Sequence, residues 1–233
     1  MCGRFVGYRN LDELKEIFPI DRSACEVTAN YNVAPSQKIL AIFNHQGQNW
    51  LDKFHWGLVP FWAKDPSIGN RMINARAETV AEKPSFKSAF KKRRCLIIAD
   101  GFYEWKTTDK RKIPFFIHFK DSEPFALAGL WDQWTNKTTG EEVVSSSIIT
   151  TSPNNLIEEI HNRMPVILDP QDYQTWLSPG NMADNVLMAC LKTYPSNEMD
   201  VYEISRKVNS PANDNPEIIQ PYASAETSSE TLF

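Results

Sequence analysis

Paired cysteines are missing from this sequence, and so are the metal-ligand spacings that often accompany them. The four cysteines, Cys2, Cys25, Cys95 and Cys190, lie far apart and form no CxxC pair. In a chain of 233 residues this spacing argues against a disulfide framework and against a zinc site. We therefore expect free thiols in a reducing compartment, with no metal and no cofactor.

Long apolar runs and an excess of positive charge are missing as well. No run approaches membrane-spanning length and the start has no hydrophobic targeting core, which predicts a soluble cytoplasmic protein without a membrane partner. The net charge of −4 gives no general attraction to nucleic acid, so DNA binding needs a local basic patch. At 42% hydrophobic residues, the chain can bury a sizeable core.

Apolar periodicity predicts that strands dominate the middle of the chain. Helices are expected over residues 10–18, with Asn10 as the cap, and over 77–90, 154–160, 169–177 and 181–191. Strands are expected over residues 38–43, 49–57, 94–99, 102–106, 114–120, 125–134, 143–151 and 201–204. Because hairpin-length turns join most strands, the expected fold class is α+β, mainly antiparallel, with a barrel-like β core and peripheral helices. We expect a single domain over 1–222 and a disordered tail over 223–233.

The second residue is the first candidate for chemistry. Removal of Met1 would leave Cys2 with an α-amine beside its thiol, and Gly3 permits a close backbone approach. Both groups have reference pKa values near enough to neutral to be partly nucleophilic. Such an aminothiol can condense with an aldehyde and close a thiazolidine ring, or its thiol can attack an acyl carbon. The position of Cys2 alone does not choose between these two reactions. It also allows a third interpretation, in which Cys2 is a buried structural residue with no reaction.

Six separated strings carry a resemblance to a known family. They are Met-Cys-Gly-Arg (1–4), Tyr-Asn-Val-Ala-Pro (31–35), Trp-Gly-Leu-Val-Pro-Phe-Trp (56–62), Ile-Asn-Ala-Arg-Ala-Glu-Thr (73–79), Ala-Asp-Gly-Phe-Tyr-Glu-Trp-Lys (99–106) and His-Asn-Arg-Met-Pro (161–165). In this order, the chain closely resembles the SOS response-associated peptidase (SRAP) family of abasic-site processing proteins. The resemblance runs from residue 1 to about Tyr222. Asn162 departs from it, because relatives often have aspartate there, which could alter how His161 is oriented.

The resemblance implies a reaction and a set of residues. Mature Cys2 would crosslink, through a thiazolidine, to the ring-opened aldehyde of an abasic site in single-stranded DNA. Its implied catalytic partners are Asn74, which orients the terminus or the sugar, Glu104, a proton shuttle, and His161, which assists ring opening, Schiff-base chemistry or reversal. Its implied DNA-binding residues are Arg4, Arg76 and Arg163 on phosphates, with Asn32, Trp62 and Thr150 as groove walls. The protein would act as a monomer, at the nucleoid within the cytoplasm.

Taken singly, these residues also have structural interpretations. Strand alternation can turn Glu104 to solvent, and a histidine after a helix, as at His161, often serves only as a dipole partner. Phe61 and Trp62, in a Pro-bounded loop, could stack on bases or belong to the core. Two basic runs are candidate phosphate contacts or plain solvated faces: Lys87, Lys91, Lys92, Arg93 and Arg94, and then Lys106, Lys110, Arg111 and Lys112.

Three other functional classes remain open. A class-II glutamine amidotransferase also begins Met-Cys-Gly, but this chain lacks a partner synthase domain. A thiol peptidase would fit the family label, with autopeptidase or abasic-site lyase side activities. A noncatalytic single-strand-binding module would hold intact and abasic DNA equally well. We assign no site residues to the loosely matching segments 23–30 and 210–215.

Overall fold

A five-stranded β-barrel forms the centre of the computed structural model, which describes residues 2–109 and 111–222. Its strands are β4 (Lys38–His45), β5 (Gln48–Trp56), β7 (Arg94–Ala99), β10 (Phe125–Thr135) and β11 (Glu142–Thr151). Antiparallel pairings run in the order β5-β4-β7-β10-β11. A parallel pairing of β11 with β5, through Ser145↔His55 and Ser146↔Trp56, closes the ring. The expected α+β, mainly antiparallel and barrel-like fold is therefore confirmed.

Short strands extend the barrel at its edges. β12 (Met164–Pro165) pairs antiparallel with β11, while β6 (Asn74–Arg76) pairs with β11 in parallel. On the other side, β2 (Arg22–Ser23) adds to β5. β11 thus brings residues from three separate stretches of the chain to one edge.

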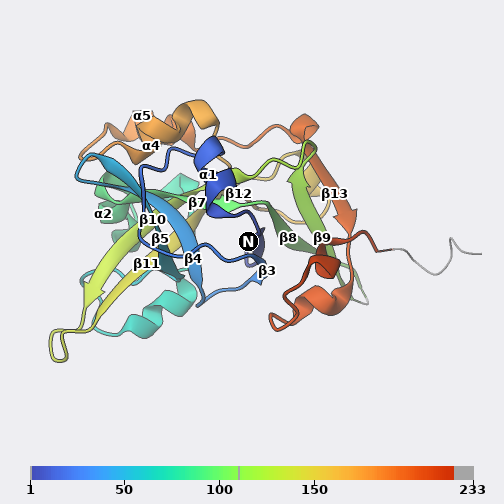
Figure 1. The fold of residues 1–233 in the computed structure, drawn as a ribbon, viewed down its shortest axis with the longest axis horizontal. Helices are drawn as coiled ribbons and strands as arrows, with labels where there is room; N and C mark the ends of the chain where they lie inside the picture. Colours follow the sequence, from blue (N-terminus) through green and yellow to red (C-terminus); the bar gives the residue numbers. More distant parts are fainter. Residues whose placement is uncertain (1, 110, 223–233) are drawn as a thin grey trace, which may run out of the picture.

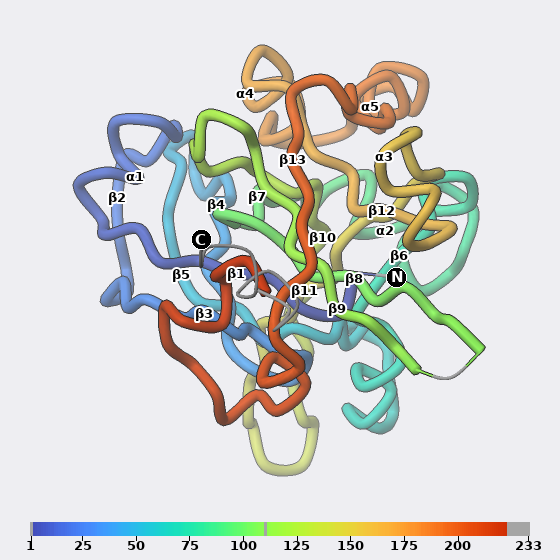
Figure 2. Tube along the Cα trace, turned by 90° about the vertical axis from the view of Figure 1, so that its right-hand side faces the viewer, coloured from blue at the N-terminus to red at the C-terminus, as the bar shows by residue number. Residues whose placement is uncertain are grey.

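A second antiparallel sheet lies against the barrel and carries the amino-terminal strand. Its order is β13 (Met199–Glu203), β9 (Lys112–Phe119), β8 (Gly101–Thr107), β1 (Phe5–Gly7) and β3 (Asn30–Val33). Figure 2 looks onto the side of the molecule where this sheet lies. Because β1 sits between β8 and β3, the residues just before it are held on both sides.

Helices cover one flank of the barrel. α2 (Pro84–Lys92), α4 (Tyr173–Leu177) and α5 (Asp184–Cys190) lie beside β7 and β10, at the upper left of Figure 1. With α1 (Leu11–Ile17) they bury one apolar cluster that includes Leu14, Phe90, Trp176 and Leu187. The remaining short helices are α3 (Asn155–Glu158) and the 3-10 turns Pro66–Arg71, Ala77–Thr79, Pro170–Asp172, Ser196–Glu198, Arg206–Asn209 and Pro216–Ile219. None of the helices found in the described ranges has the length and apolar character that a membrane crossing requires.

Most of the expected elements are present, with one clear error. Asn10 caps α1 by accepting hydrogen bonds from the backbone N–H groups of Asp12 and Glu13, as its position predicts. The helix expected over 77–90 is wrong in its first half, where only the turn Ala77–Thr79 forms and α2 begins at Pro84. Proline disfavours helical backbone in the residue before it and fits the first helical position, so it sets the start. The tail expected over 223–233 lies outside the described residues.

Candidate active site

Cys2 lies three residues before the start of β1 and is completely buried. The side-chain Nδ2 of Asn74, in β6, donates a hydrogen bond to the carbonyl oxygen of Cys2 over 2.9 Å. The Oδ1 of the same amide is buried and has no hydrogen-bond partner among the residues that the structure describes. Burial, and then the nearby charge of Glu104, raise the pKa of the Cys2 thiol, so the neutral thiol predominates at pH 7.

Glu104 is buried in β8, with 3% of its surface exposed. The structural interpretation that turned it to solvent is wrong, because both faces of this strand are covered. Tyr103 and Trp105 pack toward a cluster that includes Val208 and Ile218, while Phe102 packs into the barrel-side cluster. Burial raises the pKa of the Glu104 carboxyl to about 7, although the amino-terminal charge and hydrogen bonds act in the opposite direction. This carboxyl can therefore donate or accept a proton near neutral pH.

His161 follows α3 and is half-buried. Its Nδ1 lies 3.1 Å from the backbone nitrogen of Arg163, whose N–H it can accept. Burial lowers the pKa of His161, and the charges of the amino terminus and of Lys112 lower it further, so the neutral ring is favoured at pH 7.

A cavity of about 500 Å³ joins two of the expected catalytic residues. Its lining consists of Glu104, Trp105, Thr107, Lys112, His161 and Asn209. The other two expected catalytic residues, Cys2 and Asn74, lie in the same region. Glu104 is close enough to Cys2 to raise its pKa, and Asn74 donates a hydrogen bond to Cys2. The four expected catalytic residues are thus brought together from β6, β8, the loop after α3 and the start of the chain.

Arg4 and Asn32 join the amino-terminal strand to the segment 206–213. The Nη1 of Arg4 donates to Oδ1 of Asn32 at 2.5 Å and to the carbonyl oxygen of Val208 at 2.9 Å. The Nδ2 of Asn32 lies within hydrogen-bonding distance of the carbonyl oxygens of Val208, Ser210 and Asn213. Asn32 is fully buried. It cannot form an accessible groove wall as expected; it positions Arg4 and this segment instead.

Arg76, Thr150 and Arg163 meet at the edge of β11. Thr150 pairs with Arg76 on one side and with Pro165 on the other. It is fully buried, so it too supports the site rather than lining a surface. The guanidinium of Arg163 donates to the Thr150 carbonyl oxygen at 2.6 Å and to both carboxylate oxygens of Glu78, at 2.5 and 3.0 Å. Two arginines and one glutamate leave a surplus positive charge here.

Trp62 lies away from this cavity, in the loop before the turn Pro66–Arg71. Phe61 is 54% exposed and Trp62 49% exposed, so the alternative that placed them in the core is wrong. The buried carboxylate of Asp132 accepts the backbone N–H of Phe61 at 3.1 Å and pairs with Arg93 at 3.2 Å. The Arg93 guanidinium lies 5.7 Å from the centre of the Phe61 ring. An exposed aromatic pair is thus held on a fixed backbone.

The first basic run does not form a DNA-binding patch as a unit. Arg94 is buried, and its guanidinium donates to the backbone carbonyls of Trp176, Phe90, Lys91 and Ser178. Arg93 forms an ion pair with Asp132. In the second run Lys112 lines the cavity, while Lys110 lies outside the described residues.

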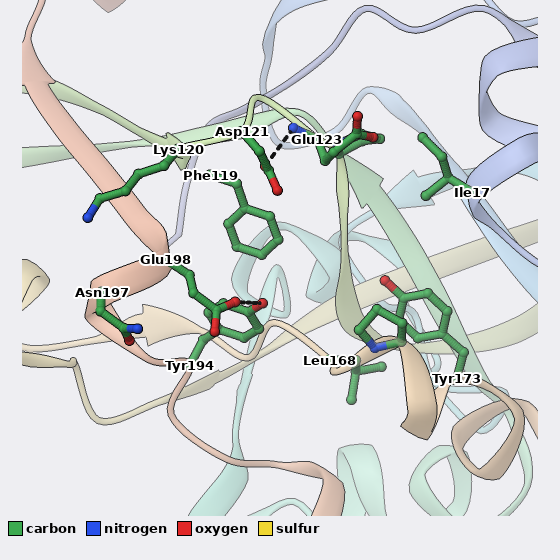
Figure 3. Close-up of a pocket in the computed structure, with 12 residues that line it drawn as sticks. Ile17, Phe119, Lys120, Asp121, Glu123, Leu168, Tyr173, Tyr194, Asn197 and Glu198 are labelled. Carbon is green, nitrogen blue, oxygen red and sulfur yellow. Dashed lines mark hydrogen bonds between the residues drawn. The ribbon is translucent and has the colours of Figure 1, made fainter.

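A second cavity of about 500 Å³ contains none of the expected site residues. Figure 3 shows the ring of Phe119 and the hydrogen-bonded pair Tyr194–Glu198 facing this space. Asp121, Glu123 and Glu198 supply three carboxylates to its lining against the single charge of Lys120. This balance disfavours a polyanion, so the cavity beside Glu104 is the better candidate for DNA.

Thr107, Lys112 and Asn209 are site residues that the sequence did not single out. Lys112 stood within a basic run, but nothing distinguished it from its neighbours. Asn209 directly precedes a segment to which no site was assigned. Only folding brings it to Trp105, whose Nε1 donates to its Oδ1 over 2.8 Å.

A barrel flanked by a sheet that holds a buried amino-terminal cysteine, an asparagine and a carboxyl of raised pKa defines a candidate N-terminal-nucleophile site. The family model described as SOS response associated peptidase (SRAP) matches residues 1–211, and the chain belongs to this family. The resemblance stated from the six strings is therefore confirmed.

Named relatives and a solved structure agree with this assignment. The chain is 48% identical over 225 residues to the abasic site processing protein YoqW of Bacillus subtilis, covering 95% of this chain and all of the relative. It is 31% identical over 232 residues to the abasic site processing protein YedK of Escherichia coli, with 95% and 100% covered. A crystal structure of a Bacteroides thetaiotaomicron protein is 30% identical, with a TM-score of 0.86, and covers 95% of this chain and 100% of that one.

Proposed function

We propose that this protein captures abasic sites in single-stranded DNA by a covalent bond to Cys2, and thereby shields the lesion. The amine exposed by removal of Met1, which lies outside the described residues, attacks the ring-opened sugar aldehyde and forms an imine with loss of one water. The Cys2 sulfur then adds to the same carbon, and its proton passes to the imine nitrogen. The product is a thiazolidine, formed without oxidant or reductant.

The observation that carries the proposal is the raised pKa of Glu104 beside a buried Cys2 held by Asn74. Loss of water from the first adduct needs an acid, and formation of the free amine needs a base. A carboxyl with a pKa of about 7 supplies both forms at neutral pH. Because the Cys2 thiol is neutral in its buried state, we infer that the amine reacts first and the sulfur second.

Binding of the strand would use the arginine edge and the aromatic loop. Arg76 lies two residues after Asn74 in β6, and with Arg163 it supplies positive charge at the edge of β11. Arg4 forms no ion pair with a carboxylate among the described residues. Trp62, with Phe61, offers an exposed ring on which a base can stack. An abasic nucleotide has no base to read, so we expect recognition without sequence preference, by a monomer acting on DNA in the cytoplasm.

The test is incubation with uracil-containing single-stranded DNA that has been treated with a uracil glycosylase. The wild-type protein should give a band that survives denaturation, high salt and heat. Cys2→Ala keeps the amine but cannot close the ring, so it should give an adduct only after borohydride reduction of the imine. Equal, fully reversible retention of intact and abasic strands would instead support a noncatalytic binding module.

The main alternative is a glutamine-hydrolysing site of the amidotransferase type. It would use the same Cys2, with Asn74 near an oxyanion. Release of ammonia from glutamine, lost in Cys2→Ala, would favour it. Strand cleavage at the lesion and removal of Met1 by the protein itself are measured in the same preparations, as tests of lyase and autopeptidase activity.

A further inference from the structure

Most of the residues that line the cavity beside Glu104 are not among the expected catalytic residues. Glu104 and His161 supply one part of the lining, and the rest comes from the β8–β9 hairpin and the segment 206–209. Thr107, at the end of β8, pairs with Lys112, at the start of β9, so the two face the cavity from the same level of the hairpin. This part of the cavity has no role in the reaction proposed above.

Asn209 is held in place from two directions. Its backbone carbonyl accepts a hydrogen bond from Nη2 of Arg4 at 3.2 Å, and its Oδ1 accepts one from Nε1 of Trp105 at 2.8 Å. These contacts use its acceptors and leave the Nδ2 group as a donor at the cavity. In Figure 1 the segment that carries it lies next to β8 and β9, at the lower right.

Lys112 and His161 are electrostatically coupled across the same space. The pKa of His161 is lowered first by burial, and the charge of Lys112 contributes to the shift. No ion pair joins Lys112 to a carboxylate within the described parts of the chain. Lys112, the amide of Asn209 and the hydroxyl of Thr107 thus line one cavity, and together they complement an anionic, oxygen-rich group.

We propose that Lys112, together with Asn209, binds a backbone phosphate adjacent to the abasic sugar. This inference rests on the proposed function, because it takes the sugar itself to lie near Cys2 and Glu104. It assigns the DNA a second contact region, formed by the β8–β9 hairpin and the segment 206–209, in addition to the arginine edge of β11. A strand held at both regions would present its lesion to Cys2 with the backbone fixed on each side of the sugar.

The experiment measures noncovalent binding, so that it does not depend on the crosslink. The probe is a single-stranded oligonucleotide with a tetrahydrofuran abasic analogue, which has no aldehyde. Lys112→Ala should weaken binding by about three- to tenfold and reduce the dependence of log K on log salt by about 0.7. Arg111→Ala is the matched control, since Arg111 is an exposed cation on the same hairpin that does not line the cavity. It should change neither quantity by as much.

A second arm locates the phosphate. Single phosphates beside the analogue are replaced, one at a time, by uncharged methylphosphonates. At one position the substitution should weaken wild-type binding yet leave Lys112→Ala binding unchanged, which is the non-additivity expected of a direct contact. Asn209→Asp keeps the acceptor for Trp105 and replaces the donor with a negative charge, so it should also weaken binding at that position.

The outcomes separate the two proposals. Equal binding by wild type and Lys112→Ala, equal losses in Lys112→Ala and Arg111→Ala, or additive effects at every phosphate would each overturn this inference. Failure of the wild-type protein to crosslink a true abasic site, with these binding differences intact, would overturn the covalent function and leave the phosphate contact standing. Thermal unfolding of each variant checks that it is folded.

Discussion

The side chain of Asn74 holds the backbone of Cys2, through a hydrogen bond of 2.9 Å to the Cys2 carbonyl oxygen. β6, which carries Asn74, is itself fixed by its pairing with β11, so the orientation of the terminal residue is set by the barrel. The second sheet holds β1, which begins three residues after Cys2, through its pairing with β8. The nucleophile is thus positioned where the two sheets meet.

Asn74→Ala should therefore slow crosslinking without abolishing it. Loss of one orienting hydrogen bond, at about 1–2 kcal/mol, corresponds to a rate lower by roughly five- to thirtyfold. The measurement is the single-turnover rate at saturating abasic DNA. Asn181→Ala, at an exposed position, is the control and should keep the wild-type rate. An unchanged rate in Asn74→Ala would remove this residue from the mechanism.

Glu104→Gln should stabilise the protein at high pH while it impairs crosslinking. The pKa of Glu104 is raised in the folded state to about 7, so the native protein binds more protons than the unfolded chain between pH 4.5 and 7. Stability linked to this group is fully present below pH 4.5 and is lost as the pH rises to about 7. The variant should gain up to about 3 kcal/mol over wild type at pH 8 and nothing at pH 4.

Urea denaturation at several pH values checks the sign of this effect. A stability difference between Glu104→Gln and wild type that is constant from pH 4 to pH 8 would show that Glu104 titrates with an ordinary pKa. Its assignment as proton donor and acceptor would then have to be abandoned.

Asn32→Ala should lower the stability of the folded protein, and any loss of DNA affinity should follow from that loss of stability. The substitution leaves the carbonyl oxygens of Ser210 and Asn213 without the Asn32 donor and removes an acceptor from Arg4. We expect a loss of about 2–4 kcal/mol in the free energy of unfolding, because several buried groups lose partners together. A variant of wild-type stability whose only defect is DNA affinity would restore Asn32 as a direct contact.

Asp132→Asn should weaken DNA binding through the aromatic loop. It removes the charge that pairs with Arg93 and loosens the acceptor for the Phe61 N–H, while Trp62 itself is unchanged. Trp62→Ala should cost about 1–3 kcal/mol of binding, and Asp132→Asn less. If the loop acts as a unit, the double variant should bind no more weakly than Trp62→Ala alone. Additive losses of binding would show that Asp132 acts independently of Trp62. A lower crosslinking rate at saturating DNA would contradict a role in binding.

The local elements were the most predictable part of the fold. Alternation and turn residues located the barrel strands, and Asn10 located the start of α1, because both signals depend on neighbours in sequence. The parallel closure of β11 on β5 was not predictable in this way. It joins Ser145 to His55, residues that no local pattern relates.

The site was predictable only as far as its motifs extend. The family resemblance named Cys2, Asn74, Glu104 and His161, and the structure brings them together. The burial of Glu104 could not be predicted, because it depends on the tertiary packing of the β8 face that Glu104 shares with Phe102, which packs into the barrel-side cluster. Asn209 contacts Trp105 across 104 positions of sequence. Asn32 was expected at a surface but is buried, because it too contacts a segment that is distant in sequence, at Val208.

The most direct test of the account is the mass and location of the crosslink. After reaction with glycosylase-treated single-stranded DNA, the digested adduct should map to an amino-terminal peptide that begins at Cys2. Its mass should equal that of peptide plus sugar fragment less one water, and it should survive without borohydride. An adduct mapped to a lysine, or one formed equally well by protein that retains Met1, would contradict the thiazolidine at Cys2.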